Sequence, residues 1–279
     1  MTWTVSLVSL LALASGLLPL IGAASALKRT PLFPTTLWLL ASWASAMVSG
    51  ICSLIGSPAL PWLYGSLALT ACAFVSVLGA RRPGVGAWNF VTLGLLAVLS
   101  LPFLEQPWDS PHWVADTPWA VLLGGVLTVG VVNYVPTRWC WAALGLALGF
   151  AVALVGLNDP ELAMLRSPAC LHLLLAWFAL GSWIAWWLLS LRVKGSDPCS
   201  LIWLRFRDAY GLMWAKRVQE QFNVAASHAG LTARLNWHGL DWPKAASENA
   251  IPRQKEEEQL CQLLLAVLKR FGVQDEASK

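Results

Sequence analysis

The chain has 279 residues, of which 57% are hydrophobic and only 12% are charged, with a formal net charge of +4. A soluble domain carries about 25% charged residues, so this composition excludes an ordinary soluble protein and predicts an integral membrane protein. The excess of lysine and arginine lies between apolar segments and near the C-terminus, as expected of a membrane protein. We therefore expect the lipid bilayer, and no nucleic acid, among its partners.

Seven apolar segments follow one another along the first 191 residues of the chain. At a rise of 1.5 Å per residue, about 20 residues cross a hydrocarbon core of about 30 Å. We therefore predict an all-α fold, a polytopic bundle of about seven transmembrane helices. The predicted spans are Thr4–Leu27, Thr35–Ile55, Pro61–Ala80, Gly86–Leu104, Pro118–Val135, Trp139–Leu157 and Pro168–Leu191. Pro19 predicts a kink in the first span.

The first span ends near Ala24-Ser25-Ala26, which resembles a signal-peptidase cleavage site. No lysine or arginine precedes this span, and it is longer than the apolar region of about 7–15 residues in a signal peptide. We therefore expect it to remain in the protein as the first membrane helix.

The charges between the spans are sorted by sign. Basic residues occupy alternate gaps, at Lys28, Arg29, Arg81, Arg82, Arg138, Arg192 and Lys194. Acidic residues occupy the other gaps, at Glu105, Asp109, Asp116, Asp159 and Glu161, accompanied by one base, Arg166. Because lysine and arginine gather in cytoplasmic loops, we predict an outside N-terminus and a cytoplasmic C-terminus. The short loops favour a bacterial cytoplasmic (inner) membrane.

The six cysteines are scattered and form no C-x-x-C pair. This spacing predicts neither a disulfide framework nor a zinc site, so we interpret them as small buried hydrophobic residues and expect no metal.

Glycines and deep tryptophans indicate close packing of the spans. Gly145 and Gly149 form a G-x-x-x-G pattern, and Gly124, Gly125 and Gly130 line the preceding span. We favour packing within the bundle over a dimer interface. Four deep tryptophans either line a cavity or, as we favour, pack against other helices and lipid: Trp38, Trp43, Trp177 and Trp183.

Most of the remaining charge follows the last span, so we divide the chain into a bundle, 1–195, and a cytoplasmic tail, 196–279. Asp197 and Pro198 predict the start of a helix that runs to about Ala229, where Gly230 ends it. Its apolar stripe comprises Trp203, Phe206, Tyr210, Met213, Trp214, Val218, Phe222 and Ala225, and Arg205, Asp208, Lys216 and Glu220 lie off that stripe.

The rest of the tail predicts a strand, a linker and a helix. Apolar and polar residues alternate from Leu231 to His238, a strand pattern. A polar linker with two prolines follows over Trp242–Glu258, overlapping the start of a last helix at about Arg253–Phe271. Three arrangements of the tail stay open: the long helix lies on an anionic lipid surface, docks to a partner protein, or packs with the other elements as a small domain.

Few residues in the spans suggest chemistry. Ionisable groups in a membrane are functional candidates, and His172 is the clear one here, with Asn89 and Asn133 as neutral polar residues. Buried carboxylates and an internal repeat are missing from the sequence, which disfavours ion-coupled transport. The sequence also lacks the motifs of serine hydrolases, zinc proteases, phosphate-binding loops and EF-hands.

The loop from Glu105 to Thr117 is rich in polar and aromatic residues. It holds His112, which lies at a similar depth to His172, and two imidazoles beside tryptophans are able to ligate haem. Trp108-Asp109 followed by Asp116-Thr117-Pro118-Trp119 resembles the tryptophan-rich loop of haem-handling proteins of cytochrome c maturation. The resemblance covers about a dozen residues. It lacks that family's Trp-Gly-x-x-Trp pattern, so it assigns no site.

Three functions follow from these observations. We favour a non-catalytic membrane protein without cofactor, an accessory, assembly or scaffold subunit of a larger membrane complex. One alternative is a haem-handling protein or another enzyme of the outer face, which rests on His112, His172, Asp109 and Asp116. The other is a permease or channel for a neutral solute, which rests on the deep tryptophans and Asn133.

Overall fold

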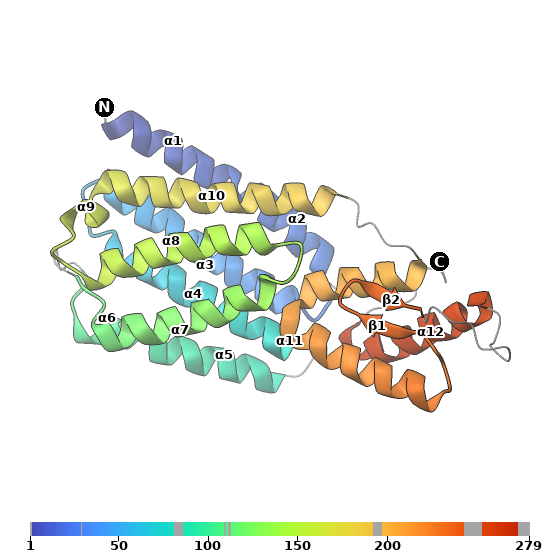
Figure 1. Cartoon of the computed structure of the whole chain (residues 1–279). Helices are drawn as coiled ribbons and strands as arrows, with labels where there is room; N and C mark the ends of the chain where they lie inside the picture. Colours follow the sequence, from blue (N-terminus) through green and yellow to red (C-terminus); the bar gives the residue numbers. More distant parts are fainter. Residues whose placement is uncertain are drawn as a thin grey trace.

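A computed structural model describes residues 2–28, 30–80, 86–108, 110, 113–191, 197–242 and 253–272. Among these residues, seven helical segments are long and apolar enough to cross a membrane. They run side by side and form an elongated helix bundle (Figure 1). An all-α bundle with seven candidate transmembrane helices is therefore confirmed.

The described part of the bundle contains ten helices, because two candidate spans are each built from two helices and the short α9 lies between the last two spans. The helices are α1 (Thr2–Ser15), α2 (Leu17–Leu27), α3 (Phe33–Leu54), α4 (Leu60–Gly79), α5 (Gly86–Leu99), α6 (Pro102–Glu105), α7 (Thr117–Tyr134), α8 (Cys140–Asn158), α9 (Ala163–Arg166) and α10 (Pro168–Ser190). The candidate spans Trp3–Leu27 and Trp88–Glu105 each join two of these helices.

The first span is interrupted at Gly16, three residues before the proline that predicts a kink. Pro19 has no N–H to donate to the carbonyl of Ser15, so the hydrogen-bond ladder is broken there. Next to this interruption, the carbonyl of Leu13 accepts from the indole Nε1 of Trp43 at 2.9 Å and from the Gly16 N–H at 3.1 Å. A Cβ on Gly16 would lie 2.5 Å from the Trp43 ring, so a glycine permits this close approach.

The core of the bundle is centred on α4. In the candidate span Leu60–Gly79, 56% of the most apolar 18 residues are buried, which is a larger share than in the other candidate spans. It contacts α3, α5, α7 and α8, while α1 packs mainly on α10. Gly149 faces Phe178 and Trp177 of α10, where a Cβ would lie 2.7 Å from Phe178, so the prediction of packing within the bundle is confirmed for this glycine.

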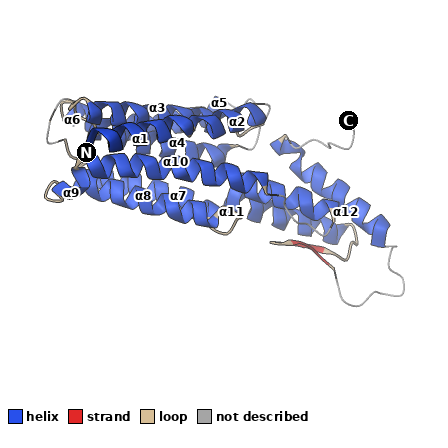
Figure 2. Ribbon diagram, turned by 90° about the horizontal axis from the view of Figure 1, so that it is seen from above, coloured by secondary structure: helices blue, strands red, loops and turns tan. Residues whose placement is uncertain are grey.

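The residues after the bundle form α11 (Pro198–His228), β1 (Arg234–Asn236), β2 (Gly239–Asp241), α12 (Arg253–Leu268) and a short 3-10 helix, η1 (Lys269–Phe271). They lie beyond one end of the bundle, opposite α6 and α9 (Figures 1 and 2). We call that end the tail end, and the opposite end the α6–α9 end.

A second cluster of buried hydrophobic residues lies between these elements. It joins α11, β1 and α12, and it continues into the bundle through Leu32, Val77 and Ala80. Six predicted stripe residues of α11 are among its members: Trp203, Phe206, Tyr210, Trp214, Val218 and Phe222. Met213 of the same stripe is instead 57% exposed.

The predicted ends of α11 are confirmed, but its middle is not. The Asp197 side chain accepts a hydrogen bond from the Ser200 backbone N–H, and Gly230 adopts a left-handed conformation after the helix. Inside α11, Gly211 has φ 75° and ψ −172°, so the helix is broken in two. The pattern of apolar residues gives no sign of this break because it keeps its helical spacing on both sides.

The strand predicted at Leu231–His238 is shorter in the structure, where β1 covers Arg234–Asn236. It pairs with a second strand, β2, that was not predicted. β1 pairs antiparallel with β2, in the register Leu235 opposite Leu240 and Asn236 opposite Gly239. Trp237 and His238 form the two-residue turn between them. The last helix begins at Arg253 as predicted, and the rest of the predicted linker, residues 243–252, lies outside the described residues.

Candidate functional site

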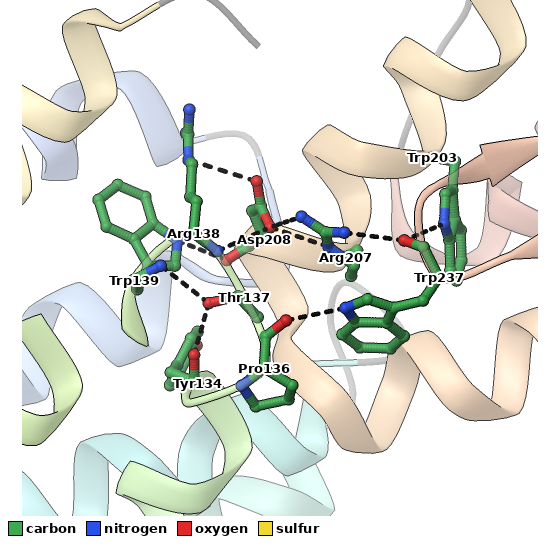
Figure 3. A network of polar contacts seen from close by, with 9 residues as sticks. All are labelled: Tyr134, Pro136, Thr137, Arg138, Trp139, Trp203, Arg207, Asp208 and Trp237. Carbon is green, nitrogen blue, oxygen red and sulfur yellow. Dashed lines mark hydrogen bonds and ion pairs between the residues drawn. The ribbon is translucent and has the colours of Figure 1, made fainter. Parts of the chain in front are cut away.

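The tail end of the bundle holds a buried carboxylate between two arginines. Asp208 of α11 is 2% exposed and accepts hydrogen bonds from Arg207 Nε at 3.0 Å and Arg207 Nη2 at 2.8 Å. Arg138, in the turn between α7 and α8, places its Nε 3.3 Å from the other carboxylate oxygen. The network therefore links the bundle to α11 through opposite charges (Figure 3).

The same turn supplies donors to the backbone of α11. A helix break leaves the carbonyls of the preceding turn without helical partners. Trp139 Nε1 donates to the carbonyl of Asp208 at 2.9 Å, and the Tyr134 hydroxyl donates to that of Ala209 at 3.3 Å. The Asn133 amide donates to the carbonyl of Tyr210 at 3.3 Å. Three consecutive carbonyls thus receive donors from α7 and the α7–α8 turn.

Asn133 also bonds to the backbone on the C-terminal side of the break in α11. Its side-chain oxygen accepts from the backbone N–H of Met213, at 3.0 Å. A Cβ at Gly211 would lie 2.2 Å from the Asn133 amide nitrogen, and φ near +75° is itself unfavourable for other residues. Glycine at 211 and asparagine at 133 are therefore complementary. We call this assembly, residues 133–139 with 207–213, the bundle–tail joint.

The hairpin is attached to the same turn. Trp237 Nε1 donates to the carbonyl of Pro136 at 2.8 Å, and Arg207 Nη1 donates to the carbonyl of Trp237 at 2.8 Å (Figure 3). Arg207 therefore bonds to both Asp208 and the hairpin. Two parts of the tail are held by one turn of the bundle.

Aromatic side chains extend the joint into the second cluster. Trp214 Nε1 donates to the carbonyl of Val77 at 3.1 Å, and the Tyr210 hydroxyl donates to the carbonyl of Phe271 at 3.0 Å. Burial, and secondarily the neighbouring Tyr134, raises the pKa of Tyr210 above its ordinary value. Its hydroxyl therefore stays protonated and remains a donor.

Glu256 of α12 attaches the end of the tail in a similar way. This glutamate is buried, and its Oε1 accepts from the backbone N–H groups of Thr232 and Ala233. It also accepts from the Thr232 hydroxyl at 2.9 Å. A buried carboxylate that accepts several hydrogen bonds is typical of a structural anchor.

The joint has the chemistry of a structural connection. Its carboxylate is paired with two arginines, and no nucleophile in the joint is hydrogen-bonded to a base. Among the described residues, no group of three or more His, Cys, Asp or Glu side chains is arranged to hold a metal ion. The arrangement suits holding the tail in one orientation.

Asp208 lies off the apolar stripe of α11 as predicted, but its burial was not predicted. The spacing along α11 grouped it with Arg205, Lys216 and Glu220 off the apolar stripe; the other three are exposed, but Asp208 is buried. The stripe faces the rest of the tail, whereas Asp208 faces the α7–α8 turn. In the sequence, the adjacent residues Arg207 and Asp208 and the isolated Arg138 are the only indication of this network. They do not show that Asp208 and Arg138 are in contact.

Of the two histidines predicted as weak cofactor candidates, the structure describes only His172. His172 of α10 is 1% exposed, with its Nδ1 2.8 Å from the Ser9 hydroxyl of α1 and its Nε2 without a hydrogen-bond partner. His112, like Asp109 in the same loop, lies outside the described residues. Haem ligation by this pair therefore stays a prediction.

A cavity of about 230 Å³ lies inside the bundle, between α1, α3, α4, α8 and α10. Its walls are mostly apolar, with Trp43 among them, and its polar groups are hydroxyls: Ser42, Ser66, Thr70 and Ser182. Ser42 and Thr70 lie 2.8 Å apart and bond to each other. Trp177 and Trp183, by contrast, are exposed on the outside of the bundle and donate to the carbonyl of Gly145 in α8 and the hydroxyl of Ser15 in α1.

Comparison of the chain with models of known protein families, with curated proteins and with solved structures found no match. We therefore infer function from the geometry of the residues.

Proposed function

We propose that the chain is a non-catalytic multi-pass membrane protein, an accessory, assembly or scaffold subunit of a larger membrane complex. The bundle–tail joint carries this proposal. A tail that was flexibly attached to the bundle would not need these contacts. The buried carboxylate, the broken helix and the donor for each freed carbonyl are features of a tail held in one orientation. Buried ionic groups cost desolvation energy, and their best-attested use is to specify one arrangement rather than to add stability.

The orientation follows from the charges at the two ends. Lys28 and Arg138 are at the tail end, whereas Glu105, Asp116 and Glu161 are at the α6–α9 end. Arg29, Arg81, Arg82, Arg192 and Lys194 lie outside the described residues. We assign the tail end to the cytoplasm of a bacterial inner membrane because positive residues favour that side. The tail is then a cytoplasmic domain held in a defined orientation beneath the bundle.

The partner surface we assign is the exposed stripe of α11. Met213, Arg217, Glu220 and Val224 recur at helical spacing on its outer face, and two of them are apolar: Met213 is 57% exposed and Val224 58%. A mixed apolar and charged stripe suits another protein subunit of the complex. The buried face of α11 is occupied by α12 and the hairpin, so the outer stripe is the face left for a partner.

Mild-detergent extraction from the native membrane, after cross-linking, tests the proposal. We expect a discrete species larger than the monomer, which Asp208→Ala removes because the tail loses its orientation. Glu258→Gln, at an exposed position of α12, leaves both the joint and the proposed partner surface intact and is the control for a change of charge in the tail. A wild-type monomer that cross-links to nothing in its native membrane contradicts the proposal.

The internal cavity favours a second candidate, a pathway for a neutral solute. It lies among the spans, and the broken first span borders it at Leu13 and Leu20. Interrupted membrane helices beside a central cavity are typical of transporter sites. Stopped-flow swelling of proteoliposomes with glycerol or urea separates the candidates. Faster swelling than in empty liposomes, abolished by Ala46→Trp in the cavity wall, supports this pathway, and no difference supports the subunit.

A further inference from the structure

The α6–α9 end holds a second cavity, of about 280 Å³, far from the bundle–tail joint. It is bordered by the end of α3, the α3–α4 turn, the start of α4, the start of α10 and the loop before α7. Arg166, the last residue of α9, lies in its wall. The cavity therefore lies where the candidate spans end and a membrane surface begins.

The described residues that line this cavity carry a positive charge. None of the described lining residues is acidic, and Arg166 has no carboxylate within ion-pair distance among the described residues. Its Nη2 donates to the backbone carbonyl of Trp113, which orients the guanidinium without neutralising it. Desolvation by burial lowers the pKa of Arg166, but a guanidinium stays protonated at neutral pH. A half-buried cation that has no counter-ion among the described residues favours an anionic ligand.

Two long helices begin at the cavity and add to the positive potential. α4 has 20 residues and starts at Leu60, and α10 has 23 residues and starts at Pro168. The first turn of α4 has no side-chain cap. Pro61 has no N–H and the Leu63 N–H donates to the carbonyl of Ala59, so the N–H groups of Leu60 and Trp62 are the ones left for a ligand. The C-terminal end of α3 also borders the cavity and contributes a negative potential. The positive potential from Arg166 and the N-termini of α4 and α10 is larger than this one contribution.

Further donors line the cavity. Ser53, Ser57 and Ser110 contribute hydroxyl groups. Trp113 is 1% exposed, and its buried indole nitrogen has no hydrogen-bond partner among the described residues, although such a donor normally has one. The other walls, including Leu60 and Leu171, are apolar. Donors and a cation beside apolar walls suit a ligand with an anionic group and an apolar part.

We propose that this cavity binds one phosphate-type anionic group at the membrane surface, with Arg166 as its principal charge partner. The group has two possible sources, the headgroup of an anionic phospholipid or a soluble phosphate. Both present oxygens that accept from the guanidinium and from the N-terminus of α4. The site lies at the end of the molecule opposite the tail, so it is independent of the partner surface on α11.

Ser57 offers a matched pair of variants. Its side chain is exposed at the cavity and makes no hydrogen bond in the described structure. Ser57→Asp places a carboxylate beside the cavity, whereas Ser57→Asn adds a neutral group of the same size. Neither substitution at Ser57 removes a contact that stabilises the fold. The comparison of the two therefore tests the proposal even if Arg166→Gln disturbs the loop that contains Trp113.

Native mass spectrometry of the purified full chain, titrated with phosphatidylglycerol, measures the lipid source. We expect one saturable lipid in the wild type, bound about tenfold more weakly by Ser57→Asp and Arg166→Gln, and unchanged in Ser57→Asn and in the remote control Lys216→Gln. Inorganic phosphate, titrated by calorimetry into delipidated protein, measures the soluble source with the same variants. Equal binding by Ser57→Asp and Ser57→Asn in both titrations overturns the proposal, as does wild-type binding of neither probe.

Discussion

At the scale of single residues, Asp208 decides how the tail meets the bundle. Its carboxylate bonds to Arg207 on the same helix and lies within 3.3 Å of Arg138 Nε on the α7–α8 turn. Removing it leaves two cations without their counter-charge in a largely buried place. Breaking a buried pair in this way is costly because the remaining charge stays desolvated.

We predict that Asp208→Ala lowers the free energy of unfolding by about 3–5 kcal/mol. Asp208→Asn costs less, because its amide oxygen still accepts from Arg207. Thermal unfolding in detergent, followed by tryptophan fluorescence, measures both. Glu220→Gln, on the exposed face of the same helix, is the control and changes the free energy by less than about 0.5 kcal/mol. An Asp208→Ala variant as stable as this control contradicts the role assigned to the carboxylate.

At the scale of elements, the break in α11 combines a backbone conformation with a side-chain fit. Gly211 has positive φ and lies against Asn133, whereas Gly230 has φ 70° and a Cβ there would meet nothing within 4 Å. Substituting each glycine by alanine therefore separates two contributions to the free energy of unfolding: backbone strain at positive φ, present at both positions, and a steric clash, present at Gly211 alone.

We predict that Gly230→Ala costs about 1 kcal/mol, from its left-handed conformation alone. Gly211→Ala costs more than about 2 kcal/mol, because it adds a displaced Asn133 to backbone strain. Equilibrium unfolding in detergent measures the difference. Equal costs for the two variants would show that Asn133 does not fit closely against the break.

The packing of α7 on α4 gives a second prediction for an element. A Cβ on Gly130 would lie 2.1 Å from the Phe74 ring, whereas a Cβ on Gly125 of the same helix meets nothing within 4 Å. We expect Gly130→Ala to destabilise the bundle by about 1–3 kcal/mol through overpacking. Gly125→Ala is neutral, or stabilises by about 0.5–1 kcal/mol through helix propensity. The apparent melting temperatures of the two variants in detergent check this order.

At the scale of the whole molecule, the two ends carry different chemistry. The tail end has paired charges and a fixed tail, and the α6–α9 end has a cavity with a cation that lacks a counter-ion among the described residues. Between them the bundle contains small residues, hydroxyls and tryptophans. The two proposed interactions, a protein partner and an anionic group, therefore belong to opposite membrane surfaces.

Labelling of single cysteines in intact cells tests the orientation. In a background without the six native cysteines, we expect a membrane-impermeant maleimide to label Glu161→Cys at the α6–α9 end. Lys216→Cys on α11 reacts only after the cells are opened. Both positions are exposed, so accessibility from each side decides the result. The reverse pattern contradicts the orientation that we infer from the positive residues.

The sequence by itself determined the number of candidate spans and their bounds to within a few residues. The last span was predicted as Pro168–Leu191 and is observed as Pro168–Ser190, and the final helix starts at Arg253 as predicted. These features are local, because crossing hydrocarbon requires a continuous run of about 20 apolar residues whatever the neighbours are.

Only the tertiary structure decided the break at Gly211, the burial of Asp208 and the cavity beside Arg166. Each depends on partners that are distant along the chain: Asn133 bonds to Tyr210 across 77 residues, and Arg166 bonds to Trp113 across 53. A broken helix or a buried charge is stable only where such partners supply the missing donors and counter-charges. The spacing of residues along one helix cannot specify those partners, and the fold brings them together.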